Sequence, residues 1–213
     1  MKMKKIILAS ASPRRHELLD LLGIEHEVIP CKEDEKQLRV VEKSKPEMKQ
    51  KITPKTIEQL VLELAYQKAS CVAKILPANK KKNTLVIGAD TIVVLDDKII
   101  GKPKSKKEAI SMLQKLLGNI HEVYTGLCVI DLNDDKILSA VEKTAVSMIE
   151  WPIEKIEAYF EAENVLDKAG GYAIQGKGAA MINRVEGCYY NVMGLPLSRL
   201  VIMLEKLEYN YLR

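Results

Sequence analysis

Two adjacent arginines, Arg14 and Arg15, directly follow the start signal of a helix. Serine at position 12 is a good N-cap, and Pro13 suits the first helical turn because the N–H group it lacks would have had no partner. The helix macrodipole disfavours cations at this end. An anion bound to the free backbone N–H groups and clamped by both guanidinium groups would compensate. Two solvated surface arginines are the alternative, and the residues alone leave both open.

Asp90 could act as a metal ligand or a general base. It follows the apolar run 84–88, which is typical of a buried strand, and it stands in the sequence Gly88-Ala-Asp-Thr91. Because α/β folds place ligands at strand ends, a carboxylate at this position predicts metal binding or general-base catalysis. An aspartate that only forms a turn is the alternative.

Lys68 is unusual because it falls within the apolar stripe of a helix predicted at 56–76, in register with Val61, Leu64 and Val72. A lysine in such a stripe either extends along the surface to reach water or points inward to an anion. A second lysine, Lys102, is presented by Gly101-Lys102-Pro103, where proline stiffens the loop. Taken alone, Lys102 is a surface lysine in a turn.

The segment 167–176, Asp-Lys-Ala-Gly-Gly-Tyr-Ala-Ile-Gln-Gly, is a glycine-rich loop that carries Lys168 and Gln175. Its glycines allow the backbone to approach a ligand closely. It matches neither a Walker A loop nor a Rossmann fingerprint. The three histidines (16, 26 and 121) lack metal-ligand spacing, and no nucleophile–base pair is recognisable.

These residues form a consistent set. Several cations without a nucleophile, together with a carboxylate and an acidic segment, fit a nucleoside triphosphate, whose hydrolysis depends mainly on positioning and charge stabilisation. The cations are Arg14, Arg15, Lys68, Lys102 and Lys168.

Composition narrows the class of protein. A chain of 213 residues with a net charge of +4 predicts neither a nucleic-acid partner nor several independent domains. Four widely spaced cysteines without a CxxC pair suggest reduced thiols rather than a disulfide framework or a zinc site. The apolar run 6–9 is too short for a signal peptide or a membrane span, so we expect a cytoplasmic protein without a membrane contact.

Apolar periodicity and turn residues predict an α/β domain with a long mixed sheet, carrying two lobes and spanning 1–213 as one unit. Helices are expected at 56–76 from a capping box at Thr56, at 105–118 from a capping box at Ser105, from Pro152 to about 161, and from Pro196 onward. Strands are expected at 25–29, 84–88, 91–95, 98–100, 121–132 and 136–149, with a hairpin of 179–185 and 188–193. Residues 31–55 are expected to form a long charged loop.

Four motifs in order resemble the Maf (septum-formation inhibitor-like) nucleotide pyrophosphatases: Ser10-Ala-Ser-Pro-Arg-Arg15, Gly88-Ala-Asp-Thr91, Gly101-Lys-Pro103 and the segment 167–176. The resemblance covers nearly the whole chain, including the helix that follows Gly194-Leu-Pro196. It implies an elongated α/β fold with a twisted mixed sheet, related to the inosine-triphosphate pyrophosphatases. It also implies a cleft between two lobes, a divalent metal (Mg²⁺ or Mn²⁺) and a homodimer.

The resemblance also implies roles for individual residues. Asp90 would bind the metal or activate water, and Glu35, the best match to a metal-binding glutamate, would be a second metal ligand. Lys68 and Lys102 would act in catalysis. The residues implied to bind substrate are Ser10, Ser12, Arg14, Arg15, Thr91, Lys168 and Gln175.

Within the family, GADT with a downstream IQG resembles the branch acting on dTTP and UTP. Thr91 and Gln175, together with Arg14, would then read the pyrimidine, because a glutamine amide can donate and accept together. The expected reaction releases pyrophosphate and leaves the monophosphate. Two alternatives remain at this point: a 7-methyl-GTP pyrophosphatase of the same family, whose corresponding motif is GSDQ, and a nucleotide-binding regulator of cell division without catalysis.

Overall fold

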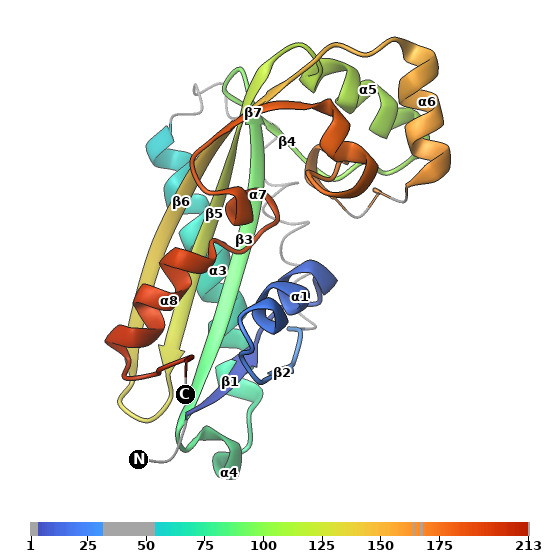
Figure 1. Ribbon diagram of the computed structural model, residues 1–213. Helices are drawn as coiled ribbons and strands as arrows, with labels where there is room; N and C mark the ends of the chain where they lie inside the picture. The colour runs from blue at the N-terminus through green and yellow to red at the C-terminus, as the bar shows by residue number, and fades with distance from the viewer. Residues whose placement is uncertain (1–3, 32–53, 164, 167, 213) are drawn as a thin grey trace.

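A seven-stranded mixed sheet runs along the molecule (Figure 1). The computed structural model describes residues 4–31, 54–163, 165–166 and 168–212. Along the sheet the order is β2 (His26–Val28), β1 (Lys5–Leu8), β3 (Thr84–Leu95), β5 (Ile120–Asp131), β6 (Lys136–Met148) and β7 (Ile182–Glu186). The first three of these strands are mutually parallel, the remaining pairings are antiparallel, and β4 (Lys98–Ile100) forms a hairpin with β3. The mixed α/β class expected from the sequence is confirmed.

Helices cover both faces of the sheet. The long helix α3 (Pro54–Ile75) lies on one face against β3 and β5, followed by the short α4 (Ala78–Lys81). On the other face lie α1 (Pro13–Leu21) and α8 (Leu197–Lys206). At the top of Figure 1, α5 (Lys106–Leu116), α6 (Ile153–Ala162) and the 3₁₀ segments η1 (Ala169–Gly171) and η2 (Gly176–Met181) form an upper lobe with β4. A short helix, α7 (Tyr189–Val192), follows β7.

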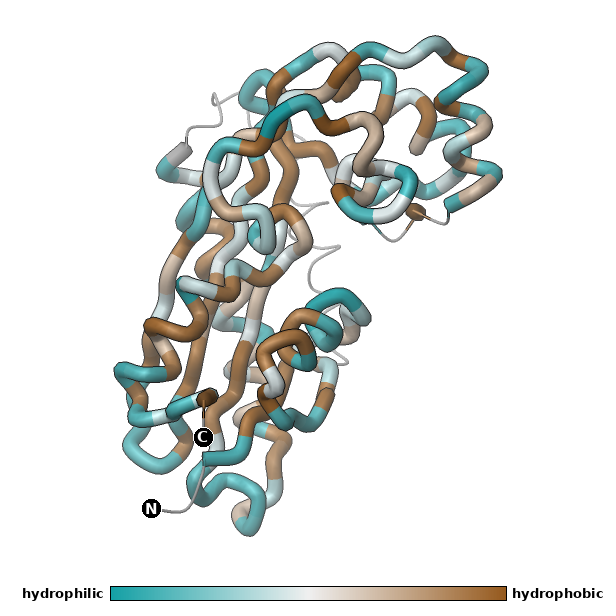
Figure 2. The backbone as a smooth tube through the Cα atoms, viewed as in Figure 1, coloured by the Kyte–Doolittle hydropathy of each residue, from teal (hydrophilic) through white to brown (hydrophobic). Residues whose placement is uncertain are grey.

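Strand alternation separates the core into two sides. In β1, Ile6 and Leu8 pack with α1 and α8 in the larger cluster, whereas Ile7 and Ala9 pack on the side of α3. The central strands are accordingly hydrophobic along most of their length (Figure 2). Both faces of β1 and β3 are buried, which explains why their sequences are near-continuous apolar runs.

β3 differs from the prediction in a way that matters for Asp90. The sequence predicted two short strands, 84–88 and 91–95, with Asp90 at a strand end. Instead Thr84–Leu95 is one strand of 12 residues, and Asp90 lies in its middle, opposite Gly126 of β5. The small and polar residues Gly88, Ala89 and Asp90 do not break the strand, because β5 pairs with it without interruption from Leu85 to Val94.

Two other predictions on secondary structure are wrong. α3 begins at Pro54 rather than at a capping box on Thr56. The hairpin of 179–185 with 188–193 does not form: β7 pairs with β6, and residues 189–192 form a helix that buries Asn191. Ser105 is confirmed as an N-cap, since its hydroxyl accepts a hydrogen bond from the Glu108 N–H group at 3.2 Å. The Glu108 carboxylate accepts from the Lys104 N–H group at 2.7 Å, one residue before the position that a capping box requires.

The prediction of four reduced cysteines is also wrong. Cys31, at the end of the segment after β2, and Cys71, on α3, form a disulfide with a Cα–Cα distance of 5.9 Å. The two residues are 40 positions apart, so their proximity arises from the packing of α3 and not from any local spacing. Cys128 and Cys188 are free thiols. Among the described residues, no helix is long and apolar enough to cross a membrane.

Candidate active site

Two glycines bring α3 unusually close to the sheet. A Cβ atom on Gly88 would lie 2.2 Å from the Ala65 carbonyl oxygen, and one on Gly126 would lie 2.1 Å from the Val61 carbonyl oxygen. Only glycine permits this approach, because real Cβ atoms do not come so close to backbone. The helix therefore rests directly on β3 and β5, and its next turn carries Lys68 beside Asp90.

Lys68 points inward and pairs with Asp90. Its Nζ atom lies 2.6 Å from Asp90 Oδ1, and the two side chains are only 11% and 15% exposed. Lys68 therefore does not extend along the surface to water. It points inward to an anion, and that anion is a carboxylate of the protein itself. The pair fixes the orientation of Asp90, since a charge-assisted bond of this length is directional.

The edge of β3 is left unpaired around Asp90. β5 occupies one edge of β3, while β1 and β4 share the other: β1 pairs with Lys5↔Thr84 to Leu8↔Ile87, and β4 pairs with β3 from Val93 onward. Within the described residues, no strand pairs with the β3 edge at 88–92, which we call the β3 gap. Asp90 lies at its centre. The predicted position at a strand end was wrong for β3, but β1 does end beside the gap.

Arg15 lies on the other face of β3, buried and held by protein oxygen atoms. It donates from Nε to the Gly194 carbonyl at 2.8 Å and from Nη1 to the Ala89 carbonyl at 2.8 Å. It also donates to the hydroxyls of Ser10 at 3.1 Å and Thr91 at 3.0 Å. These bonds tie α1 to β3 and to the turn before α8, so Arg15 fixes the place of its neighbour Arg14.

Thr91, expected to read the base, belongs to the same buried network. Its hydroxyl accepts from Arg15 and is hydrogen-bonded to the Thr125 hydroxyl at 2.9 Å. Asn191 continues the network by donating from Nδ2 to the Val123 carbonyl and to Thr144 Oγ1. The sequence analysis did not identify Asn191; the only signal was a polar residue directly before the run Val192-Met-Gly-Leu195.

Ser10 and Ser12 organise the turn from β1 into α1. The Ser10 hydroxyl accepts hydrogen bonds from Arg15 and, at 3.2 Å, from the Ser12 N–H group. Ser12 is the N-cap residue of α1 and is half-buried, with no side-chain cap hydrogen bond. The first turn of α1 contains no acidic residue.

The upper lobe presents the remaining predicted residues. The Gly170 N–H group donates to the Gly101 carbonyl at 3.0 Å, which joins the loop of Lys102 to the loop of Lys168. Gly170 and Gly171 have φ values of +75° and +68°, a conformation that side chains disfavour. Lys102 and Gln175 are exposed and Lys168 is half-buried.

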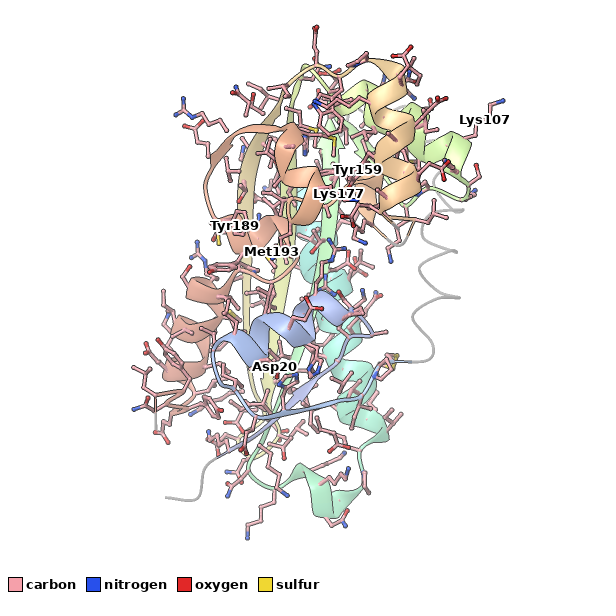
Figure 3. The ribbon with its side chains drawn as sticks, turned by 45° about the vertical axis from the view of Figure 1, so that its right-hand side comes forward. Asp20, Lys107, Tyr159, Lys177, Tyr189 and Met193 are labelled. Carbon is pink, nitrogen blue, oxygen red and sulfur yellow. A yellow bond between two sulfur atoms is a disulfide. The ribbon has the colours of Figure 1, made fainter. Side chains whose placement is uncertain are left out.

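The positive charge of Arg14, on α1, acts weakly on two tyrosines of the upper lobe. Burial raises the pKa of Tyr159 and of Tyr172, and in each case the positive charge of Arg14 opposes that rise. The charge of Arg14 therefore reaches two aromatic residues of the upper lobe. Figure 3 shows Tyr159 and Lys177 of that lobe above α1, which carries Asp20.

Of the two metal ligands predicted from the sequence, Asp90 lies among the described residues. Asp90 supplies the carboxylate oxygen that Mg²⁺ and Mn²⁺ prefer, in a half-buried position at the β3 gap, so its chemistry fits a hard divalent ion. Glu35, the other predicted ligand, lies outside the described residues.

The comparisons with known proteins agree with this arrangement. The Maf-like protein family matches residues 5–207. The dTTP/UTP pyrophosphatase of Caldicellulosiruptor bescii is 44% identical over 99% of this chain and 98% of its own length. The protein of the same name from Ruminiclostridium cellulolyticum is 45% identical over 97% of each chain. A solved nucleoside-triphosphatase / dITP/XTP pyrophosphatase from Mycobacterium abscessus overlaps 95% of this chain and 97% of its own, at 11% identity and with a TM-score of 0.38. Sequence motifs, fold and relatives together place this chain in the Maf-like protein family.

Proposed function

We propose that this protein is a metal-dependent nucleoside triphosphate pyrophosphatase that hydrolyses dTTP and UTP to the monophosphate and pyrophosphate. The observation that carries the proposal is the Lys68–Asp90 pair, which holds a carboxylate at the β3 gap. The relatives named dTTP/UTP pyrophosphatase support the substrate.

The predicted phosphate-binding cations lie on two parts of the fold. Arg14 is on α1, and Lys102 and Lys168 are on two loops of the upper lobe joined by the Gly170–Gly101 hydrogen bond. A triphosphate chain bound between them would meet positive charge on both sides. Water would attack the α-phosphorus, and the negative charge that develops on the leaving pyrophosphate would be neutralised by these side chains.

Asp90 and Lys68 have complementary tasks in this proposal. Asp90 would hold a divalent ion, Mg²⁺ or Mn²⁺, with Glu35 as a further ligand. Such an ion supplies charge neutralisation of the phosphates and a lower pKa for a bound water molecule. Lys68 would keep the carboxylate in one orientation, because its ammonium group occupies Oδ1 at 2.6 Å.

Arg15, Ser10 and Thr91 are better suited to positioning than to substrate contact. The guanidinium of Arg15 donates to four protein oxygens, and the hydroxyls of Ser10 and Thr91 accept two of those bonds. Base recognition then falls to Gln175, an exposed residue at the start of η2 whose amide can both donate to and accept from a pyrimidine imide. Ser12 stays a candidate for the triphosphate.

A product-resolved screen tests the function. Purified protein is incubated with UTP, dTTP, 7-methyl-GTP and the purine triphosphates in Mg²⁺ or Mn²⁺, and released phosphate and pyrophosphate are measured separately. We expect pyrophosphate from UTP and dTTP. Preference for 7-methyl-GTP would contradict the proposed substrate, and release of orthophosphate would contradict attack at the α-phosphorus. Tight binding without product would indicate a nucleotide-binding regulator instead. The homodimer implied by the family stays a prediction, to be measured by light scattering.

A further inference from the structure

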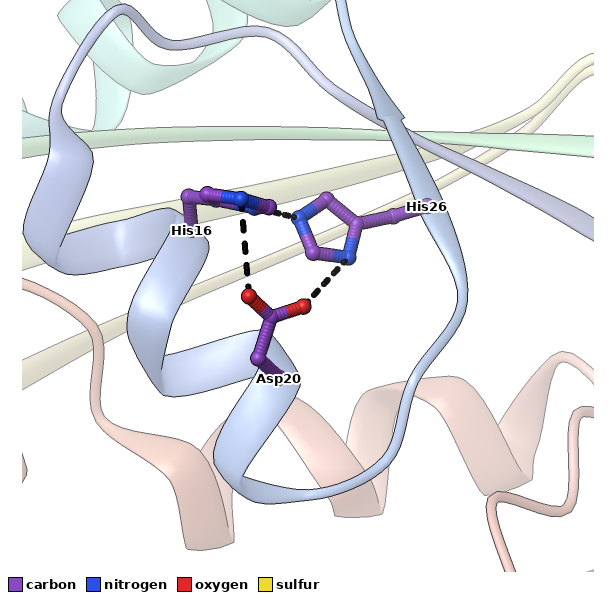
Figure 4. Close-up of side chains that lie close together, drawn as sticks. All are labelled: His16, Asp20 and His26. Atoms are coloured by element: carbon purple, nitrogen blue, oxygen red, sulfur yellow. Dashed lines mark hydrogen bonds and ion pairs between the residues drawn. The ribbon is translucent and has the colours of Figure 1, made fainter.

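A cluster of two histidines and an aspartate lies on α1 and β2, away from the β3 gap (Figure 4). His16 and Asp20 are one helical turn apart on α1, and His26 is the first residue of β2. One ligand atom from each of these residues lies within 4.8 Å of the other two. The sequence prediction that the histidines lack metal-ligand spacing is therefore wrong for this pair, because the turn between α1 and β2 folds His26 back over the helix.

The two imidazoles face one another through their ring nitrogens. His16 Nδ1 lies 2.6 Å from His26 Nε2, and the other nitrogen of His26, Nδ1, lies 2.7 Å from the Ile24 carbonyl oxygen. The carbonyl can only accept, so His26 Nδ1 carries a proton and Nε2 presents its lone pair to His16. A backbone carbonyl that fixes the tautomer of a ligating histidine is the usual outer partner in metal sites.

Asp20 completes a third side of the cluster. Its carboxylate oxygens lie 3.4 Å from His16 Nε2 and 3.9 Å from His26 Nδ1, as the dashed lines in Figure 4 show. The side chain of His26 is only 1% exposed, whereas those of His16 and Asp20 are about half exposed at 50% and 57%. His26 is thus held in a buried position, whereas the side chains of His16 and Asp20 are exposed to solvent and can adjust.

We propose that His16, Asp20 and His26 form a binding site for a Zn²⁺-class transition metal ion. Two imidazole nitrogens and a carboxylate are the donor set of zinc sites that keep one position for water. Imidazole favours zinc, cobalt and nickel over magnesium, so this site is chemically distinct from one built on Asp90.

Binding requires only a small rearrangement. Zinc–nitrogen bonds of 2.0–2.1 Å hold tetrahedral ligand atoms ~3.3 Å apart, so the two rings must separate by less than about 1 Å. When the ion takes the place of the proton between His16 Nδ1 and His26 Nε2, that proton moves through solvent to His16 Nε2, which lies 3.4 Å from Asp20, so both rings bind as neutral imidazoles. The bound ion would then join α1 directly to β2, one residue beyond Arg15.

The test is a calorimetric titration of chelator-treated protein with Zn²⁺ in the absence of nucleotide. We expect one equivalent to bind, and saturation to raise the Tm by about 5 °C or more. His16→Asn and His26→Asn should each weaken binding at least about 100-fold and abolish the Tm rise, and Asp20→Asn should weaken it about 10-fold.

Matched controls separate this site from the rest of the chain. Glu17→Gln changes an exposed acid on the same helix, and Asp90→Asn removes the proposed catalytic carboxylate; both should bind Zn²⁺ as the parent does. Circular dichroism verifies that each variant is folded. The proposal would be overturned if the parent did not bind Zn²⁺, or if the His16→Asn and His26→Asn variants bound it as tightly as the parent. The cluster would then be a hydrogen-bonded contact. The proposed pyrophosphatase function does not depend on either result.

Discussion

Arg15 donates a hydrogen bond from Nε to the carbonyl oxygen of Gly194, a residue 179 positions further along the chain, at 2.8 Å. The bond joins the first helix to the turn that precedes the last helix, and it passes beside Thr91 of the central strand. The neighbouring Arg14 makes no contribution to this network among the hydrogen bonds of the described residues, and its charge instead reaches the upper lobe. Two consecutive arginines thus serve different purposes.

This division predicts that Arg15 is needed for stability and Arg14 for substrate binding. Arg15→Ala would leave buried carbonyls and hydroxyls without a donor and should destabilise the protein by at least about 3 kcal/mol, since each orphaned group costs about 1–3 kcal/mol. Arg14→Ala should change stability by less than about 0.5 kcal/mol but raise the KM for UTP. Urea unfolding and steady-state kinetics separate the two effects. Equal loss of stability in both variants would contradict the assignment.

The close approach of α3 predicts that Gly126 does not tolerate a side chain. Gly126→Ala would place a methyl group 2.1 Å from the Val61 carbonyl, so the helix must move and the Lys68–Asp90 pair must separate. We expect a loss of at least about 3 kcal/mol, at the upper end for overpacking. Gly101→Ala is the matched control, because nothing lies within 4 Å of its added Cβ. Comparable stability of the two variants in urea would rule out the steric argument.

Asp90 is expected to be required for the reaction and not for the fold. Asp90→Asn keeps the side-chain size but loses the charge, and should lower kcat at least about 100-fold, the lower range for positioned acid–base groups. Lys68→Met should also lower kcat, because Asp90 then loses the ammonium group that orients it. Turnover is measured as pyrophosphate release at saturating UTP. Near-normal turnover by Asp90→Asn would remove this residue from the chemistry.

His121 predicts an acid-sensitive stability. It is buried at the start of β5, with Nε2 2.7 Å from the Tyr172 hydroxyl, and burial lowers the pKa of His121 to about 4. The unfolded chain, with an ordinary histidine pKa near 6.5, binds a proton between pH 6.5 and 4 that the folded protein does not. The contribution of neutral, buried His121 to the free energy of unfolding is therefore fully present above pH 6.5. It decreases as the pH falls, and about 2 kcal/mol of it is lost at pH 5.

Urea unfolding at pH 7.5 and pH 5.0 measures this dependence. His121→Gln should remove most of it, whereas the exposed His16→Asn should leave it unchanged. A parent protein that is equally stable at both pH values would show that His121 is protonated in the folded state.

The sequence predicted the fold class and drew attention to Lys68, but it did not predict the length of β3. Lys68 was identifiable because a charge inside an apolar stripe needs a partner, and the structure supplies Asp90. The strand break at Asp90 was mistaken, since glycine in a strand can serve helix packing as well as a turn.

Contacts between distant segments could not be predicted from single-sequence patterns. The pairing of Cys31 with Cys71 depends on how α3 packs, and the meeting of His16 and His26 depends on the turn between α1 and β2. Asn191 was missed because its partners, Val123 and Thr144, belong to two other strands. Each of these contacts is set by the tertiary fold, and the distance between the residues in the sequence does not indicate it.

The uninterrupted course of the long strands has a mechanical consequence. β3, β5 and β6 span 12, 12 and 13 residues, and they pair with one another along nearly their full lengths beside the β3 gap. A bend of the sheet at this position would have to deform three hydrogen-bonded strands together. The backbone that carries Asp90 is therefore stiff.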